Sequence, residues 1–511
     1  MDSMADLHGT KSTGRCNRIP LKIKVLCYIS YAILGVFGLL RKFLLLIGVE
    51  KKYRLDVEPK REGFVPLYRG LEPFFKKYAY QRICDASAYL VVGLPGPKIE
   101  IRDRISDDHN QSFRILDSTA QYINMGSYNY LGFSENTGSR VEAVCDCISA
   151  YGSAVGTTRH EYGTLDIVHD LEKMMAKFLG VEDSIVFGMG FATNTMNIPV
   201  FGGEGCLLIS DELNHASLIL GCKLSESSKK IFKHNDTEDL ERVLVESLAD
   251  GQPETHEPWR KIIILIEAIY SMEGSIVNLP EIIRLKKKYK AYLYMDEAHS
   301  IGALGRSGRG VCDHFGIKTT EVDLLMGTFT KSFAAAGGYV AGNKKLIDYL
   351  RANSHSFPYA SSMAAPIAQQ IILVLKSLME EGLETEGKKR LTELAKNSRY
   401  FRKRLEQMGF ILYGHESSPI VPLILFYPGK IKEFAVLARK LGVAVVVVGP
   451  PITSKLESRV RFCISASHSK EMLDETLEVV DYIGDKLSLK YSQNSKLKKT
   501  DSIRKVFHFS H

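Results

Sequence analysis

The stretch Ala291-Tyr-Leu-Tyr-Met-Asp-Glu-Ala-His-Ser300 is an apolar run that ends in an acid, Asp296, with an imidazole, His299, three residues later. Such runs are typical of strands in a mostly parallel sheet, where ligands bind at the carboxyl ends of the strands. A carboxylate at that position can keep a pyridine nitrogen protonated, so that the ring withdraws electrons from a substrate carbanion. An Asp that caps the next helix, beside a solvated His, explains this stretch alone about equally well.

A lysine among hydroxyls follows a second run of the same kind. In Gly327-Thr-Phe-Thr-Lys-Ser-Phe333, the hydroxyls of Thr328, Thr330 and Ser332 surround Lys331. Hydroxyls can bind a phosphate, and a desolvated pocket beside a cationic ring would lower the pKa of an imine-forming lysine. A lone lysine is usually solvated, but its pairing with Asp296 on a neighbouring strand favours a cofactor lysine.

Two further segments are weak evidence for a cofactor site alone and become informative only together with the Asp296 and Lys331 segments. Phe187-Gly-Met-Gly190-Phe191-Ala-Thr-Asn194 predicts a strand that runs into a glycine turn and a helix start, where free backbone N–H groups can bind phosphate. His215 follows another strand end, where it could stack on a flat ring, although a lone histidine is more often the neighbour of a helix cap.

Between about residues 120 and 350, short β-branched runs alternate with amphipathic stretches, which predicts an α/β fold with helices on both faces of a mostly parallel sheet. The expected strands are 184–187, 206–209, 261–267, 291–295, 323–327 and 338–341. After a helix near 391–408, strands at 420–426, 443–448 and 460–465 and helices at 431–441 and 470–487 predict a smaller α+β domain. The expected division is a polar segment 1–20, a membrane-anchoring segment 21–50, a linker and N-terminal arm 51–120, a large domain 121–380, a small C-terminal domain 381–490 and a basic flexible tail 491–511.

The N-terminal segment is apolar enough to meet a membrane. No charged residue occurs from Val25 to Leu40, and the sixteen residues would span about 24 Å as a helix, against a hydrocarbon core of about 30 Å. A retained anchor, spanning or lying in the interface, is favoured over a cleaved signal peptide because no small-residue cleavage site follows. Basic residues flank both ends of the run, so charge does not decide its orientation.

The charge distribution and the cysteine spacing argue against a nucleic-acid-binding protein and against a zinc site. The net charge of +8 comes with basic residues gathered near both termini, which suits a membrane surface better than a nucleic-acid groove. The nine cysteines are scattered and have no zinc-ligand spacing, so we expect a reducing compartment and no metal site. Cys145 and Cys147 are interpreted as small core residues.

Together these segments resemble the α-oxoamine synthases, pyridoxal-phosphate (PLP) enzymes that condense an amino acid with an acyl-CoA and release carbon dioxide. The resemblance covers about residues 120–485 and includes Asn124-Met-Gly-Ser-Tyr-Asn-Tyr130-Leu-Gly132, Gly163–Glu172 and Glu267–Gly274. It implies an aminotransferase-like (fold type I) structure with a seven-stranded sheet. Ala334 departs from the glycine expected after Lys-Ser-Phe.

The resemblance also implies roles for individual residues. Lys331 would hold the cofactor as a Schiff base, Asp296 would pair with the pyridine nitrogen, His299 would contact the ring hydroxyl and His215 would stack on the ring. Phosphate or ring-edge contacts are expected from Gly190, Phe191, Ser271 and Thr328. Arg461, with Arg459 as the alternative, would bind the substrate carboxylate near Tyr130, and the segment 450–453 resembles a loop that closes over the substrate.

Within the family, the segments around Tyr128 and Lys331 and the apolar N-terminus resemble the catalytic long-chain-base subunits of serine palmitoyltransferases. This implies L-serine and palmitoyl-CoA as substrates, 3-ketosphinganine as product, and a location at the endoplasmic reticulum membrane with the catalytic domain facing the cytosol. The implied partners are a homologous non-catalytic subunit and small regulatory membrane subunits. The alternatives are a synthase that uses glycine or alanine with another acyl-CoA, a non-catalytic scaffold subunit, against which Lys331 argues, and a membrane-tethered structural protein.

Overall fold

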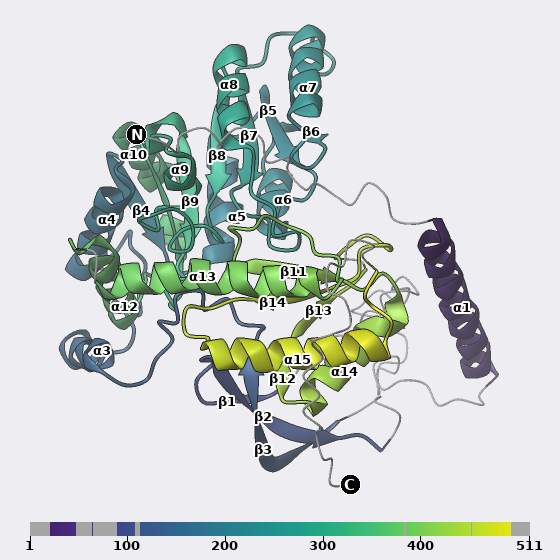
Figure 1. Cartoon of the computed structure of the whole chain (residues 1–511). Helices are drawn as coiled ribbons and strands as arrows, with labels where there is room; N and C mark the ends of the chain where they lie inside the picture. The colour runs from purple at the N-terminus through teal and green to yellow at the C-terminus, as the bar shows by residue number, and fades with distance from the viewer. Residues whose placement is uncertain are drawn as a thin grey trace, which may run out of the picture.

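The computed structural model describes residues 21–47, 64, 89–107, 113–382, 385–450 and 452–491. A seven-stranded sheet in the order β4-β10-β9-β8-β7-β5-β6 forms the centre of its larger part (Figure 1). The strands are β4 (Asp183–Phe187), β5 (Cys206–Asp211), β6 (Ser228–Phe232), β7 (Lys261–Glu267), β8 (Tyr292–Asp296), β9 (Leu324–Thr328) and β10 (Gly338–Gly342). Only β10 is antiparallel to its neighbours, so the mostly parallel, aminotransferase-like sheet is confirmed.

All six strands expected in this region are present within a residue or two of their predicted bounds. The seventh, β6, was not predicted. It reads Ser-Lys-Lys-Ile-Phe and pairs only with β5 at one edge of the sheet, so one long side stays open to solvent and can carry lysines. Its sequence therefore lacks the apolar run that marks the buried strands.

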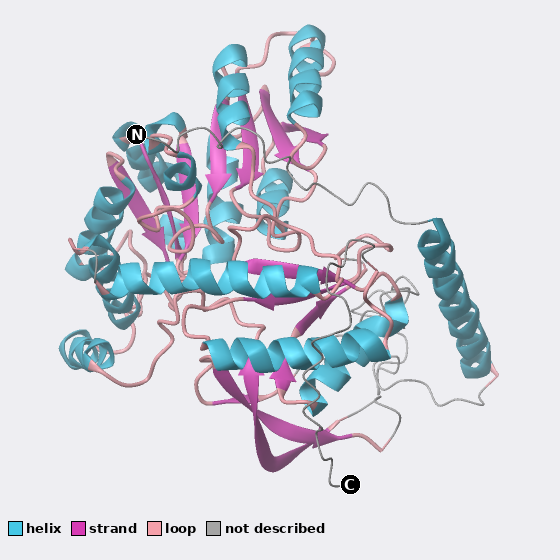
Figure 2. Ribbon diagram, viewed as in Figure 1, coloured by secondary structure: helices cyan, strands magenta, loops and turns pink. Residues whose placement is uncertain are grey.

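Helices cover both faces of the sheet (Figure 2). Successive strand residues alternate between two hydrophobic cores. In β8, Leu293 and Met295 belong to the core shared with α4, α7, α8 and α12, whereas Tyr294 belongs to the core shared with α5, α6 and α10. The helices of this part are α3 (Ser139–Tyr151), α4 (Asp166–Leu179), α5 (Gly190–Phe201), α6 (Ala216–Leu224), α7 (Thr237–Asp250), α8 (Leu279–Tyr289), α9 (Val311–Phe315), η3 (Thr319–Glu321), α10 (Lys344–Asn353), α11 (Ser356–Tyr359) and α12 (Ala365–Met379).

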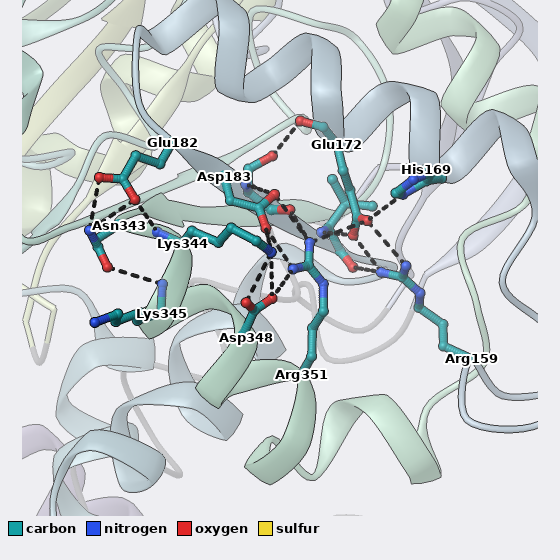
Figure 3. Close-up of polar contacts among 12 residues, drawn as sticks. Arg159, His169, Glu172, Glu182, Asp183, Asn343, Lys344, Lys345, Asp348 and Arg351 are labelled. Carbon is teal, nitrogen blue, oxygen red and sulfur yellow. Dashed lines mark hydrogen bonds and ion pairs between the residues drawn. The ribbon is translucent and has the colours of Figure 1, made fainter.

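The free edge of β4 is covered by charged side chains (Figure 3). The Val186 N–H donates to Oε1 of Glu172 (2.9 Å), and the Val186 carbonyl accepts from Nη1 of Arg159 (3.3 Å). Nη2 of Arg351 donates to the carbonyl of Ser184 (2.9 Å). Side chains therefore take the place of a further strand, so the edge is closed to another chain.

The segment expected to be the small C-terminal domain, called the small domain below, has the expected helices α13 (Glu386–Gln407), α14 (Pro428–Lys440) and α15 (Lys470–Lys486), with a sheet in the order β11-β14-β13. Its strands are β11 (Ile420–Ile424), β13 (Val446–Val448) and β14 (Arg459–Cys463). The single strand expected at 443–448 is wrong. Val443–Ala444 forms β12, which pairs with β3, whereas β13 pairs with β14, because the chain leaves one sheet for the other at Val445.

A second sheet lies within and beside the segment expected to be a linker and arm. It joins β1 (Val91–Val92), β2 (Lys98–Ile105), β3 (Arg114–Asn124) and β12. The expected polar segment 1–20, the basic tail after residue 491 and Pro451 of the expected closing loop lie outside the described residues. Cys145 is exposed, so its interpretation as a core residue is wrong, whereas Cys147 two positions later in α3 is buried.

The apolar N-terminal segment forms α1 (Leu21–Leu46), drawn at the right of Figure 1. Residues 21–40 are long and apolar enough to cross a membrane, with a mean hydropathy of 2.0. Cys27 is fully buried against the small domain, where its Sγ lies 3.3 Å from the carbonyl oxygen of Phe426 and 3.5 Å from that of Lys455, either of which can accept its single S–H. One face of α1 is thus docked on protein while most of its other apolar side chains are exposed.

Candidate active site

Four strands of the large sheet end in polar residues at the same edge. Asp211 ends β5, Glu267 ends β7, Asp296 ends β8 and Thr328 ends β9. Since these strands run parallel, their carboxyl ends meet at one edge of the sheet. Burial, followed by the nearby charge of Asp296, raises the pKa of Glu267 well above its ordinary value.

Lys331 lies in the loop after β9 and is half-buried. Desolvation lowers the pKa of its amine to about 8, with Asp296 and Glu267 opposing the shift and Arg461 adding to it. The Nζ atom lies 5.6 Å from the centre of the Tyr128 ring. The amine is therefore neutral in a much larger fraction of molecules near neutral pH than an ordinary lysine.

The carboxylate of Asp296 is buried and held by two donors. Nδ2 of Asn194 donates to its Oδ2 (2.7 Å), and the N–H of Ala298 donates to its Oδ1 (2.8 Å). Both bonds fix the orientation of the carboxyl group, which is the partner that a protonated pyridine nitrogen requires. The sequence did not single out Asn194 for this contact, although it ends the quoted glycine-turn segment.

His299 and the two tyrosines of the Tyr-Asn-Tyr segment lie together. The hydroxyl of Tyr130 is 2.8 Å from Nδ1 of His299, and Tyr130 is fully buried. Burial, with the cations Lys331 and Arg461, holds the pKa of His299 well below its usual value. Tyr128, which was not among the expected site residues, lies with its ring edge toward His299 at a centroid distance of 5.3 Å. Tyr130 thus binds the His299 ring through a hydrogen bond, whereas Tyr128 lies beside Lys331.

The two candidate arginines of β14 differ in what they contact. Arg459 has no exposed surface and donates to the carbonyls of Glu457 and Met272, with ion pairs to Glu273 (3.2 Å) and Glu457 (3.4 Å). Arg461 lies with its guanidinium 4.7 Å from the centre of the Tyr128 ring and donates to Sδ of Met272 (3.7 Å). Its buried Nε has no partner among the described residues, so it can still receive an anion.

The remaining expected residues surround the same edge. His215 is the N-cap of α6, which confirms the alternative of a residue at a helix start, and its ring lies 5.9 Å from that of Phe191. Its stacking on a cofactor stays a prediction. A Cβ built on Gly190 would come within 2.8 Å of Cγ2 of Thr328, so only glycine allows this approach. Ser271 lies half-buried in the turn that follows β7.

Comparison with known proteins agrees with this arrangement. The model of the family "Aminotransferase class I and II" matches residues 120–480. Human serine palmitoyltransferase 3 is 53% identical over 93% of this chain and 87% of its own length, and serine palmitoyltransferase 2 of Caenorhabditis elegans is 46% identical over 97% and 89%. The chain belongs to the serine palmitoyltransferases of this family. A solved structure of SPT with its PLP internal aldimine superposes with a TM-score of 0.71 at 25% identity and covers 82% of this chain and all of that one.

The residues at the sheet edge fit pyridoxal phosphate, the cofactor of this family. The α5 N-terminus has no side-chain cap, which leaves backbone N–H groups for a phosphate beside the Gly190–Thr328 contact. Asp296 offers a buried carboxylate for the pyridine nitrogen, and Lys331 offers an amine with a lowered pKa. The buried hydroxyl of Ser332 has no partner among the described residues, which leaves a further donor next to Lys331.

Proposed function

We propose that this chain is the catalytic subunit of a serine palmitoyltransferase and that its chemistry takes place around Lys331. The reaction condenses L-serine with palmitoyl-CoA and yields 3-ketosphinganine, CoA and carbon dioxide. The observation that carries the proposal is the meeting of Lys331, with its lowered amine pKa, and the buried carboxylate of Asp296 at the carboxyl edge of the sheet. The family's non-catalytic subunits, which lack this lysine, do not explain that arrangement.

Binding and orientation of serine fall to Arg461. Its guanidinium would pair with the serine carboxylate, because Arg459 is already engaged by Glu273 and Glu457. The pairing would hold the amino acid beside Tyr128 and Lys331, both of which lie near Arg461. Orientation of the substrate then decides which bond at Cα breaks.

Proton transfer falls to Lys331. With an amine pKa of about 8, the residue can take the serine α-proton at neutral pH and return a proton to the product carbon after carbon dioxide leaves. Bound pyridoxal phosphate supplies the electron sink that stabilises negative charge at Cα. Asp296 would hold its ring nitrogen, His299 its ring hydroxyl and His215 its face, with Gly190, Phe191, Ser271 and Thr328 along the phosphate and ring edge.

The membrane location and the partners are parts of the same proposal. A long acyl thioester partitions into bilayers, so an anchored enzyme meets it readily, and the exposed apolar side chains of α1 support anchoring at the endoplasmic reticulum. The seven described cysteines are all free, which supports a catalytic domain in the cytosol. Exposed apolar residues on the packed pair α5 and α6, such as Met196, Ile219 and Leu224, support a homologous partner subunit, with small membrane subunits beside it.

The decisive experiment replaces the lysine in the intact membrane complex. We expect Lys331→Ala to abolish condensation and the visible absorbance of the bound cofactor, while Lys396→Ala, an exposed lysine of α13, leaves both unchanged. Persistence of the cofactor band and of condensation in Lys331→Ala would contradict the proposal.

Substrate identity is tested separately. The purified complex is given serine, glycine or alanine with acyl-CoA thioesters of graded length, and the released CoA is measured. We expect serine with a sixteen-carbon thioester to react fastest. A preference for glycine with a short acyl-CoA would instead favour a different α-oxoamine synthase.

A further inference from the structure

Asn194 connects two residues of the site that lie on different elements. Besides Asp296, its Nδ2 donates to Oγ of Ser217 (2.9 Å), and its Oδ1 accepts from the hydroxyl of Tyr294 (2.9 Å). The Ser217 hydroxyl in turn lies 2.7 Å from Nδ1 of His215. Asn194, Ser217 and Tyr294 are each about 1% exposed, so water does not compete for these bonds.

The direction of each bond follows from what the groups can donate. A carboxylate only accepts, so the Asn194 atom facing Asp296 must be the amide nitrogen, and the amide oxygen is left to accept from Tyr294. The second amide hydrogen points to Oγ of Ser217, which therefore uses its own hydrogen elsewhere. The acceptor within reach of that hydrogen is Nδ1 of His215, 2.7 Å from Oγ.

The backbone supports the same assignment. The Ser217 N–H also points at Nδ1 of His215 (3.3 Å), as an N-cap contact of α6. With two donors directed at it, Nδ1 is an acceptor, and the proton of a neutral imidazole must lie on Nε2. Besides burial, two charged groups shift the pKa of this ring: Asp296 on β8 raises it and Lys331 after β9 lowers it. Glu267 on β7 does not bind the ring but accepts a hydrogen bond from the backbone N–H of His215.

We propose that Asn194 and Ser217 form a buried relay that fixes His215 as the tautomer protonated on Nε2 and ties its orientation to the carboxylate of Asp296. Asn194 and Ser217 are positioning residues, since the relay acts through His215 and Asp296. The face of the cofactor and the nitrogen of its ring are thus held by one hydrogen-bonded unit. The role of His215 beside the cofactor rests on the proposed function, whereas its tautomer is a property of the protein alone.

The first test measures the tautomer without cofactor. The apo-complex is labelled with ¹⁵N-histidine, and the His215 signals are assigned by their loss in His215→Gln. We expect a pyridine-like Nδ1 and a pyrrole-like Nε2, and in Ser217→Ala a shift toward a mixture of both tautomers. Ser398→Ala, which removes an equally buried hydroxyl from α13, should leave the signals unchanged. A wild-type Nδ1 that carries the proton, or identical signals in Ser217→Ala, would overturn the proposal.

The second test measures the link to Asp296. Asn194→Asp keeps the size of the side chain but removes both amide donors and places a second carboxylate beside Asp296. We expect cofactor to dissociate at least about tenfold faster, by analogy with the loss of a group that orients a metal ligand, and kcat/KM of Ser217→Ala to fall by a similar factor. Asn397→Asp, at a buried asparagine of α13 that donates to the Ser465 and His468 carbonyls, controls for burying a carboxylate. Equal cofactor dissociation in Asn194→Asp and wild type would refute the link, and an unchanged tautomer in a well-folded Ser217→Ala would refute the relay even if Asn194→Asp fails to fold.

Discussion

Two arginines lie two positions apart on β14 and differ in their partners: Arg459 is ion-paired, whereas the Nε of Arg461 has no partner among the described residues. We therefore expect Arg461 to contribute to substrate binding and Arg459 to contribute to stability. Replacing Arg461 with alanine removes a guanidinium whose Nε has no partner in the part of the chain that the structure describes, so we expect the KM for serine to rise at least about tenfold with little loss of thermal stability. Arg459→Ala leaves the partly buried Glu273 without its ion pair, and breaking a buried pair costs up to about 3–5 kcal/mol. Serine kinetics and thermal melts of both variants measure the difference. The reverse pattern would assign the carboxylate to Arg459.

Ala334, the alanine in place of an expected glycine, adopts a backbone conformation that favours glycine. Its φ is +49°, a left-handed value that costs an L-residue about 1 kcal/mol. We therefore expect Ala334→Gly to raise the free energy of unfolding by about 0.5–1 kcal/mol. Ala335→Gly is the matched control, because its φ is not positive and the same change should lower stability. A lower melting temperature for Ala334→Gly would show that the methyl group's packing outweighs the strain.

At the residue scale, the sequence predicted the groups that follow recognisable strands. Asp296 and Lys331 each come directly after an apolar run, so their meeting at one sheet edge could be inferred from the order of the strands alone. Tyr128, Asn194 and Ser217 could not be assigned, because their roles depend on side-chain direction and on contacts between elements distant in sequence. The family resemblance already favoured Arg461 over Arg459, and the ion pairs of Arg459 supply a physical reason that the sequence could not.

At the scale of the element, the charged cover of β4 is a stability device with a measurable contribution. Glu172 is 1% exposed and is bound by Arg159 (2.6 Å), and it also accepts from the β4 backbone (Figure 3). Glu172→Gln leaves the Arg159 guanidinium buried without a counter-charge, so we expect a loss of about 3–5 kcal/mol in thermal or denaturant unfolding. Glu393→Gln, which breaks an exposed pair with Lys396, should cost less than about 1 kcal/mol.

A double variant separates the effect of an unpaired buried charge from the effect of the altered side-chain shape. Arg159→Met combined with Glu172→Gln removes both partners, and we expect it to recover part of the loss because no unpaired charge remains. If the double variant is as unstable as the sum of the two single changes, the arginine and the glutamate act independently, and the edge is held by the other contacts.

Strands were predicted well where both of their faces are buried. They were predicted poorly where a strand lies at the edge of a sheet or where the chain passes from one sheet to another. β7 was expected at its observed bounds because its six residues from Ile262 are all buried. β6 was missed because lysines occupy an open edge, and β12 and β13 were merged because six consecutive apolar residues carry no mark of the switch between two sheets. Hydrophobicity indicates burial but does not specify the pairing partner.

At the scale of the whole molecule, α1 has two faces with different partners. Cys27 and Tyr31 lie on the side that meets the small domain, whereas Ile33, Phe37 and Leu40 are more than half exposed. If the first three turns stay docked, the fourteen residues from Ile33 to Leu46 reach about 21 Å, which is less than a hydrocarbon core of about 30 Å. A helix docked in this way would enter a bilayer without crossing it and would keep the rest of the chain at the membrane surface.

This arrangement predicts that two sets of substitutions in α1 have separate effects. Cys27→Arg puts a large charged side chain into the fully buried position beside the Phe426 and Lys455 carbonyls. Because burying a charge is costly, we expect a lower melting temperature. The chain should remain in the membrane fraction. Phe37→Lys with Leu40→Lys puts two charges on the exposed apolar face, each costing about 2.5–3.5 kcal/mol at the centre of a membrane helix. We expect that variant to shift into the alkaline-carbonate supernatant with an unchanged melting temperature. Release from membranes by Cys27→Arg, or equal destabilisation by both variants, would mean that α1 acts as a single unit and that the docked face has no separate role.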